Sequence, residues 1–250
     1  MDVSFENSRG ENLAGVIDQV ENPIAQAIFS HCFTCSKDHA ASYRICKALA
    51  DQGIQVLRFD FVGLGKSEGD FSSTDFSSNI SDIKAAVDYL KNNNSAPQLL
   101  IGHSLGGIAA VAAACELDEI QAVATIAAPS RPAHVLDHFE QHIPKILKNG
   151  FDEVMVFDRS FKFTKEYILD LKEYDERHFI RKLNKPILVF HSPFDDIVSI
   201  DEAAKIFMEA KHPKSFISLD HADHLISKKR DAEYIAENIA CWAKRYINNH

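Results

Sequence analysis

The sequence lacks any apolar run that approaches the roughly 20 residues needed to cross a membrane. Its opening residues have neither the basic region nor the apolar region of a secretory signal. Positive charge is scarce, because 27 Lys and Arg residues stand against 36 Asp and Glu residues, for a net charge of −9. This balance has the wrong sign for a phosphate-binding surface. We therefore expect a soluble, cytoplasmic protein that binds neither nucleic acid nor membranes.

Cysteine is also scarce, and the five cysteines are an odd number, which fits a reducing compartment. Cys32 and Cys35 have the C-x-x-C spacing of a redox pair or of half a zinc site. No second C-x-x-C follows them, and a zinc site would need two further ligands. The pattern therefore favours loop and packing thiols over a redox pair, and it predicts no metal site.

Internal repeats and Pro/Gly/Ser-rich linkers are absent, so residues 1–250 are expected to form one domain. Short, continuously apolar β-rich runs alternate with helical patterns, which predicts an α/β fold with a mostly parallel sheet covered on both faces by helices. An antiparallel hairpin is expected to precede this sheet. The predicted strands lie at 3–5, 13–17, 25–30, 55–59, 98–101, 122–127, 187–190 and 216–219, and the predicted helices at 40–51, 75–91, 105–116, 201–210 and 232–247.

The stretch from about 130 to 185 interrupts this alternation. It mixes charged residues with scattered aromatic ones and has no regular βα pattern. A block of this kind between two core strands predicts an inserted cap over the carboxyl ends of the strands, where open α/β sheets bind their ligands.

The segment Leu99–Gly107 runs from an apolar strand through Gly-His-Ser-Leu-Gly into an Ala-rich helix. This G-x-S-x-G context predicts a tight strand-to-helix turn that exposes Ser104 at a helix N-terminus. Gly102 and Gly106 are needed there because a side chain at either position would collide with the backbone across the turn. A serine nucleophile requires a base and an orienting carboxylate, and we look for them in the chain order Ser, Asp, His. The loops after two later strands offer Asp195 or Asp196 and His221 or His224.

On these motifs the sequence resembles the α/β-hydrolases. Residues 59–67 are similar to the family's D-x-x-G-x-G-x-S loop, and His31-Cys32-Phe33 stands where the family usually has His-Gly-x. Residues 31–38, 58–69 and 212–216 resemble, more narrowly, the hydrolase half of bifunctional proteins in which an α/β-hydrolase precedes an OsmC-type peroxidase domain.

The resemblance implies a role for each candidate residue. Ser104 is the expected nucleophile. Asp195, which fits the family pattern better than Asp196, is the orienting carboxylate, and His224, preferred to His221, is the base. The implied oxyanion hole consists of the backbone N–H groups of Phe33 and Leu105.

Other residues of the motifs are expected to be structural. Asp60 is expected to shape its loop, and His31 and His191, at strand ends, are expected to be hydrogen-bonded supports.

A group of three regularly spaced histidines is not part of the family resemblance. His134, His138 and His142 recur every fourth residue and would share one face of an α-helix. Without the H-E-x-x-H arrangement, this pattern favours a solvated helix of the cap over a metal site.

The expected activity is that of a serine esterase. It would cleave a carboxylic ester, or a thioester or amide, of a small to medium acyl group through an acyl-enzyme, with a small-molecule substrate and no cofactor. The alternative is a binding module with little or no turnover that assists an OsmC-type peroxide-defence protein.

Overall fold

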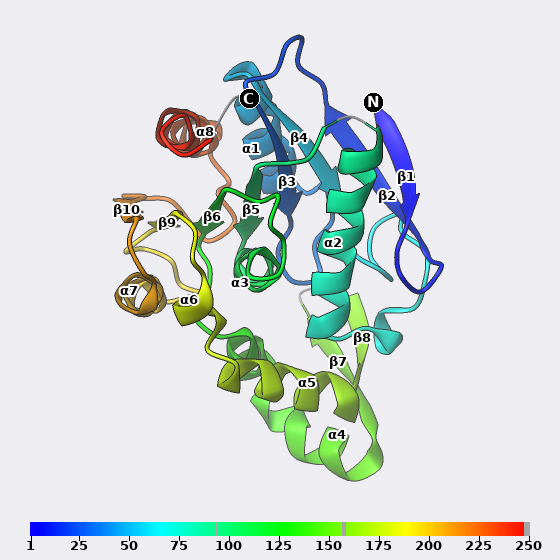
Figure 1. Cartoon of the computed structure of the whole chain (residues 1–250). Helices are drawn as coiled ribbons and strands as arrows, with labels where there is room; N and C mark the ends of the chain where they lie inside the picture. The colour runs from blue at the N-terminus through cyan, green and yellow to red at the C-terminus, as the bar shows by residue number, and fades with distance from the viewer. Residues whose placement is uncertain (94, 157–158, 248–250) are drawn as a thin grey trace.

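The computed structural model describes residues 1–93, 95–156 and 159–247, and it confirms the predicted α/β-hydrolase class of fold. Eight strands form one sheet in the order β1-β2-β4-β3-β5-β6-β9-β10. The pairs β1/β2 and β2/β4 are antiparallel and the remaining pairs are parallel, so an N-terminal hairpin precedes a parallel core as predicted (Figure 1). The strands are β1 (Asp2–Glu6), β2 (Asn12–Asp18), β3 (Ala25–Ser30), β4 (Ile54–Phe59), β5 (Leu99–His103), β6 (Ala122–Ile126), β9 (Ile187–His191) and β10 (Lys214–Ser218).

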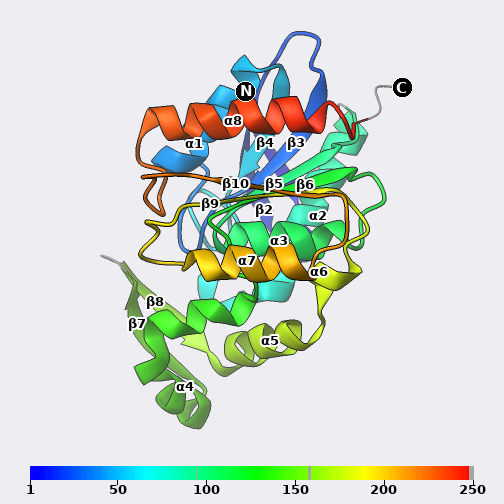
Figure 2. The same ribbon diagram turned by 90° about the vertical axis from the view of Figure 1, so that its left-hand side faces the viewer.

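Helices cover both faces of this sheet (Figure 2). One face packs on α1 and α8, and the other packs on α2, α3 and α7, so an apolar core lies on each side. The helices are α1 (Ala40–Asp51), α2 (Phe76–Asn93), α3 (Leu105–Ala114), α7 (Ile200–Glu209) and α8 (Lys229–Ala243), with a 3-10 turn η1 (Phe71–Ser73) before α2. In the part of the chain that the structure describes, no helix combines the length and apolar character that crossing a membrane requires.

Helix α3 is buried along its whole length, and its small residues let it lie close to the sheet. A Cβ atom on Gly107 would stand 2.8 Å from the Cβ of Ala128, which follows β6. The helix that begins at the expected nucleophile is therefore held at a fixed distance from the strand ends.

Between β6 and β9 the chain makes an excursion that lies to one side of the sheet (Figures 1 and 2). Its elements are η2 (Pro132–His142), α4 (Ile143–Asn149), β7 (Phe151–Val156), β8 (Arg159–Thr164), α5 (Lys165–Glu176) and α6 (Phe179–Lys182). The antiparallel pair β7/β8 was not predicted from the sequence.

An aromatic cluster joins this excursion to the body of the protein. The ring of Phe163 on β8 stacks on Phe139 of η2 at 4.5 Å between centroids. The same ring contacts Phe71 at 5.4 Å and Phe33 at 5.9 Å. Phe33 lies in the loop after β3, so the excursion packs directly on the loop that was expected to supply an oxyanion donor.

Candidate active site

Ser104 occupies a strained turn between β5 and α3, with φ 54° and ψ −126°. A Cβ on Gly102 would lie 2.2 Å from the carbonyl oxygen of Gly106, and a Cβ on Gly106 would lie 2.3 Å from the carbonyl oxygen of His31. Side chains essentially never approach backbone atoms this closely, so both positions require glycine, as the sequence indicates. The turn places Ser104 at the N-terminus of α3, where negative charge is favoured.

His224 and Asp195 reach Ser104 from the loops that follow β10 and β9. The Nε2 atom of His224 lies 3.1 Å from the Ser104 hydroxyl oxygen. Its Nδ1 atom lies 2.8 Å and 3.1 Å from the two carboxylate oxygens of Asp195. All three side chains are buried, so the three residues form one hydrogen-bonded chain shielded from bulk water.

Asp195 is held as an acceptor by groups other than His224. The backbone N–H groups of Ile197 and Val198 donate to one of its carboxylate oxygens at 3.0 Å and 2.9 Å. Burial alone would raise the pKa of Asp195, but these donors and His224 outweigh it and lower that pKa. An ionised Asp195 fixes a proton on Nδ1 of His224, which leaves Nε2 free to accept the serine proton.

The two alternative residues that the sequence offered, Asp196 and His221, lie outside this chain of hydrogen bonds. Asp196 is exposed and does not take part in this chain of hydrogen bonds. His221 is exposed, and its ring stacks on Phe194 at 5.0 Å between centroids. Its φ of 66° explains why the family pattern has glycine at this position.

Three further histidines hold the surrounding loops. His31 donates from Nδ1 to the carbonyl of Cys32 at 2.8 Å, and His191 donates from Nε2 to the carbonyl of Val198 at 2.8 Å. Burial lowers the pKa of both rings, and these contacts agree with the supporting roles predicted for them.

His103 is the third support, and sequence reasoning missed it. Its Nε2–H donates to the carbonyl of His224 at 2.7 Å. Burial and the neighbouring His224 ring lower the pKa of His103 to about 3, so the ring is neutral. It fastens the His224 loop to the strand that carries Ser104.

Phe33 lines the same cavity as Ser104, and Leu105 follows Ser104 in the chain. Among the described residues, the Phe33 N–H donates to no backbone acceptor outside helices and strands. The Leu105 N–H belongs to the first residue of α3, where an N–H has no partner within the helix. The positive φ of the loop after β3 falls on Thr34, at 57°, and not on Cys32, which stands at the family's usual glycine. Cys32 is therefore accommodated without strain.

Cys32 and Cys35 form a disulfide, so the prediction that they are packing thiols is wrong. Sequence spacing alone could not reveal the bond, because a C-x-x-C pair is equally compatible with free thiols, a metal or a disulfide. Cys46, Cys115 and Cys241 are free.

A cavity of about 200 Å³ opens beside Ser104. The excursion contributes three of its lining residues, and most of the lining is apolar. The lining residues are Cys32, Phe33, Cys35, Ser104, His138, Met155, Val156, Ile197, His224 and Leu225.

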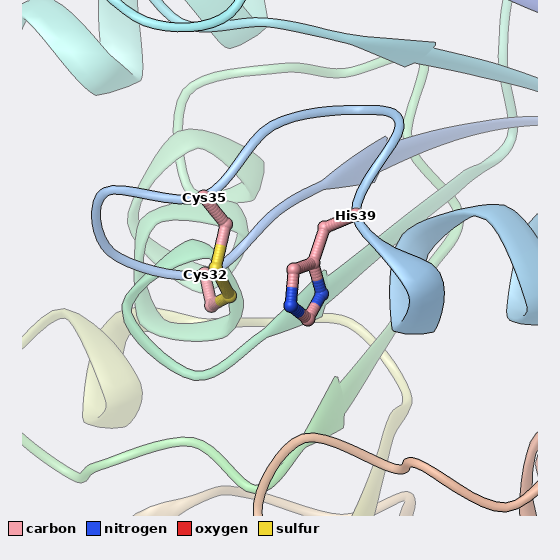
Figure 3. A group of neighbouring side chains, drawn as sticks. All are labelled: Cys32, Cys35 and His39. Atoms are coloured by element: carbon pink, nitrogen blue, oxygen red, sulfur yellow. A yellow bond between two sulfur atoms is a disulfide. The ribbon is translucent and has the colours of Figure 1, made fainter. Parts of the chain in front are cut away.

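The sequence predicted that the three spaced histidines share one helix face, and the structure shows that they do not. Their segment is a 3-10 helix rather than an α-helix, and Phe139 breaks it with φ −141°. The rings of His134 and His138 are in contact at 6.1 Å, whereas His142 bonds to the Asp152 carboxylate at 2.8 Å. Within the described ranges, the one His/Cys/Asp/Glu group compact enough to share a metal ion is Cys32, Cys35 and His39, and its two sulfurs are already bonded to each other (Figure 3).

Comparison with known proteins places the chain in a family. The family described as serine aminopeptidase, S33, matches residues 23–183. The chain belongs to this family of α/β-hydrolases. The matched segment includes Ser104 and ends before Asp195 and His224.

Similar proteins are esterases and a thioesterase. The solved esterase domain of a Rhodothermus marinus protein is 40% identical, with a TM-score of 0.78 and 99% of each chain covered. Est1E from Butyrivibrio proteoclasticus, solved with ferulic acid bound, is 22% identical, with a TM-score of 0.79 and 98% of each chain covered. The human mitochondrial palmitoyl-protein thioesterase ABHD10 is 26% identical over 203 residues, which are 78% of this chain and 64% of that protein. These likenesses support an α/β-hydrolase of the esterase or thioesterase type.

Proposed function

We propose that this chain hydrolyses carboxylic esters or thioesters of small to medium acyl groups through an acyl-enzyme formed on Ser104. The observation that carries the proposal is the buried hydrogen-bonded chain of Ser104, His224 and Asp195. A structural scaffold has no need for these three side chains at the ends of three strands.

The reaction follows from this geometry. The Ser104 oxygen attacks the substrate carbonyl while its proton passes to Nε2 of His224, and Asp195 stabilises the imidazolium that results. The developing oxyanion accepts hydrogen bonds from the N–H groups of Phe33 and Leu105. His224 then protonates the departing alkoxide or thiolate, and a water activated by the same histidine releases the acid. The steps require no cofactor.

The size and lining of the cavity suggest the acyl group. Its volume of about 200 Å³ is below the roughly 300–1,000 Å³ of pockets that hold drug-sized ligands, which favours a small to medium acyl group. We propose that the excursion acts as a cap, because His138, Met155 and Val156 close one side of this cavity. The described lining residues include no carboxylate to pair with a substrate ammonium group, which favours a neutral acyl group over an aminoacyl group.

The leaving group is an alcohol or a thiol in this proposal. The names of the similar proteins cover both possibilities, since one is an esterase domain and another a palmitoyl-protein thioesterase. An alkoxide or thiolate departs more readily than an amine, which needs a closely placed proton donor.

The proposal is tested with a fluorophosphonate probe and p-nitrophenyl esters of increasing acyl length. Wild-type protein should be labelled and should turn over the esters with an optimum at short to medium chains. Ser104→Ala should lose the label, and its kcat should fall about 10⁴-fold or more. Ser160→Ala, an exposed serine on β8, is the matched control and should behave as wild type.

Two outcomes would overturn the proposal. One is ester turnover by Ser104→Ala equal to that of the wild type. The other is an unlabelled folded protein with flat, very slow turnover at every chain length, which would favour a non-catalytic partner of an OsmC-type protein.

A further inference from the structure

We propose that Cys32 and Cys35 are a redox-modifiable pair that holds the Phe33 N–H in place, so that reduction by a dithiol reversibly lowers ester hydrolysis at Ser104. This inference rests on the proposed function, since it concerns the control of the same site.

The pair brackets the expected oxyanion donor. Phe33 and Thr34 are the only residues between the two cysteines, and the Cys35 N–H donates to the carbonyl of Cys32 at 3.1 Å. The disulfide, visible in Figure 3, therefore closes a small covalent ring that includes the backbone of Phe33 and Thr34. The Phe33 side chain is held separately by the rings of Phe71 and Phe163. The aromatic contacts therefore hold the side chain of Phe33, whereas the disulfide constrains its backbone.

The pair is reachable through the substrate cavity. Cys32 and Cys35 both line the cavity that contains Ser104. Cys32 is only 4% exposed, whereas Cys35 is partly exposed, so an incoming thiolate meets Cys35 first. The other cysteines do not line this cavity, and burial raises the pKa of the Cys46 thiol well above its ordinary value.

His39 supplies a proton acceptor beside the sulfurs. It stands at the start of α1, and one of its ring nitrogens lies within 4.8 Å of both sulfur atoms (Figure 3). The Nδ1 atom of His39 is buried and has no hydrogen-bond partner within the described part of the chain. Burial and the nearby Arg44 lower the pKa of His39, so its ring is neutral near pH 7 and can accept a proton from a thiol.

The exchange balances in two steps. One thiol of the dithiol passes its proton to the neutral His39 ring and attacks Cys35 Sγ as the thiolate, and the Cys32 sulfur leaves as a thiolate that takes this proton. The second thiol of the reductant then attacks the mixed disulfide and releases the Cys35 thiolate, which is also protonated. Two electrons and two protons pass from the dithiol, which becomes a cyclic disulfide, to the pair of cysteines.

Reduction should act on the chemical step. Two thiols cannot stay at bonding distance, so reduction leaves the turn closed by the single Cys35 N–H to Cys32 carbonyl hydrogen bond. We expect the less constrained turn to shift the Phe33 N–H from its position. Loss of one oxyanion donor costs roughly 10²–10³ in kcat, so a displaced donor should cost on the order of tenfold or more with little change in KM.

The experiment uses the full chain in both redox states. Protein is treated with dithiothreitol, desalted without oxygen so that no free thiol cleaves the ester, and divided for thiol counting and for p-nitrophenyl ester kinetics. The thiol count under denaturing conditions should rise from three to five, kcat should fall at least tenfold, and re-oxidation should restore both values. The double variant Cys32→Ser/Cys35→Ser should have the low kcat and no response to dithiothreitol. Cys241→Ser, which alters an exposed free cysteine, should keep the full activity and the full response.

The outcomes separate this inference from the proposed function. Ester hydrolysis that depends on Ser104 but is equal with three and with five thiols overturns the redox control alone. A thiol count that dithiothreitol cannot change overturns it as well, and so does one bound zinc per reduced chain, which would make the group a metal site. Absence of Ser104-dependent hydrolysis in both states instead overturns the proposed function. Melting temperatures of all variants, together with fluorophosphonate labelling, distinguish misfolding from a displaced donor.

Discussion

Asp60 ties the loop after β3 to the loop after β4 beneath the candidate active site. Its carboxylate accepts the Lys37 N–H at 2.6 Å, the Lys37 ammonium at 2.9 Å and the Lys66 N–H at 2.9 Å. The Asp60 side chain is fully buried and that of Lys37 is 3% exposed. We expect Asp60→Asn to be strongly destabilising, because the amide has a single acceptor oxygen and turns its NH₂ group toward these donors.

The magnitude follows from the burial of the pair. Removing one partner of a buried ion pair costs about 3–5 kcal/mol. Lys37 retains the Asp38 carboxylate at 2.9 Å, so we expect the lower end, about 3 kcal/mol. For a chain of this size, 1 kcal/mol shifts the melting temperature by roughly 2–4 °C, so Asp60→Asn should melt about 6–12 °C below the wild type.

The assay is thermal unfolding followed by circular dichroism at one scan rate. Asp38→Asn is the matched control, because it removes the other carboxylate on Lys37 from a side chain that is 51% exposed. Asp38 also pairs with Arg58 at 2.7 Å, and at about 0–1 kcal/mol for each half-exposed pair this variant should lose at most about 2 kcal/mol, less than Asp60→Asn. Equal shifts for the two variants would refute the argument from burial.

Two further predictions concern carboxylates in other places. Asp195→Asn lets an amide donate toward His224 and disfavours the tautomer that accepts the serine proton, so kcat for a p-nitrophenyl ester should fall about 10⁴-fold. The exposed Asp196→Asn should stay within a few-fold, and a rise in KM alone at Asp195 would contradict the assigned role. Burial raises the pKa of Asp82 to about 6, so between pH 4 and 6 the folded chain keeps a proton that the unfolded chain releases. The free energy of unfolding of the wild type, relative to Asp82→Asn, should therefore fall by about 2–3 kcal/mol as the pH rises from 4 to 7, and urea titrations that give a constant difference would disprove it.

Much of the fold could be predicted because its signals are local. Helix α1 was predicted with its observed ends, and the core strands were predicted to within about two residues, since each is a short apolar run between turn residues. The strand β7 alternates exposed and buried residues, but its segment also contains scattered charges and follows a short helix, so its pairing with β8 was not visible. Hairpins of this kind depend on a partner strand that periodicity does not identify.

The predictability of the candidate site has the same physical limit. Ser104 stands out because the strained turn demands glycine at fixed spacing on both sides. His103 carries no such signal, because its role comes from a contact with a carbonyl 121 residues away along the chain. The pairing of Cys32 with Cys35 likewise depends on how a turn closes, and composition argued for free thiols.

The loop after β3 is fixed by four different kinds of contact. His31 bonds to the carbonyl of Cys32, Phe33 packs in the aromatic cluster, Asp60 bonds to Lys37 at the far end, and a disulfide links Cys32 to Cys35. Breaking any of the first three requires a mutation or unfolding, whereas a disulfide that lines a substrate cavity can be opened chemically in the folded protein. If the Phe33 N–H stabilises the oxyanion, the same turn that supports hydrolysis is therefore the part of the site through which a thiol can regulate it.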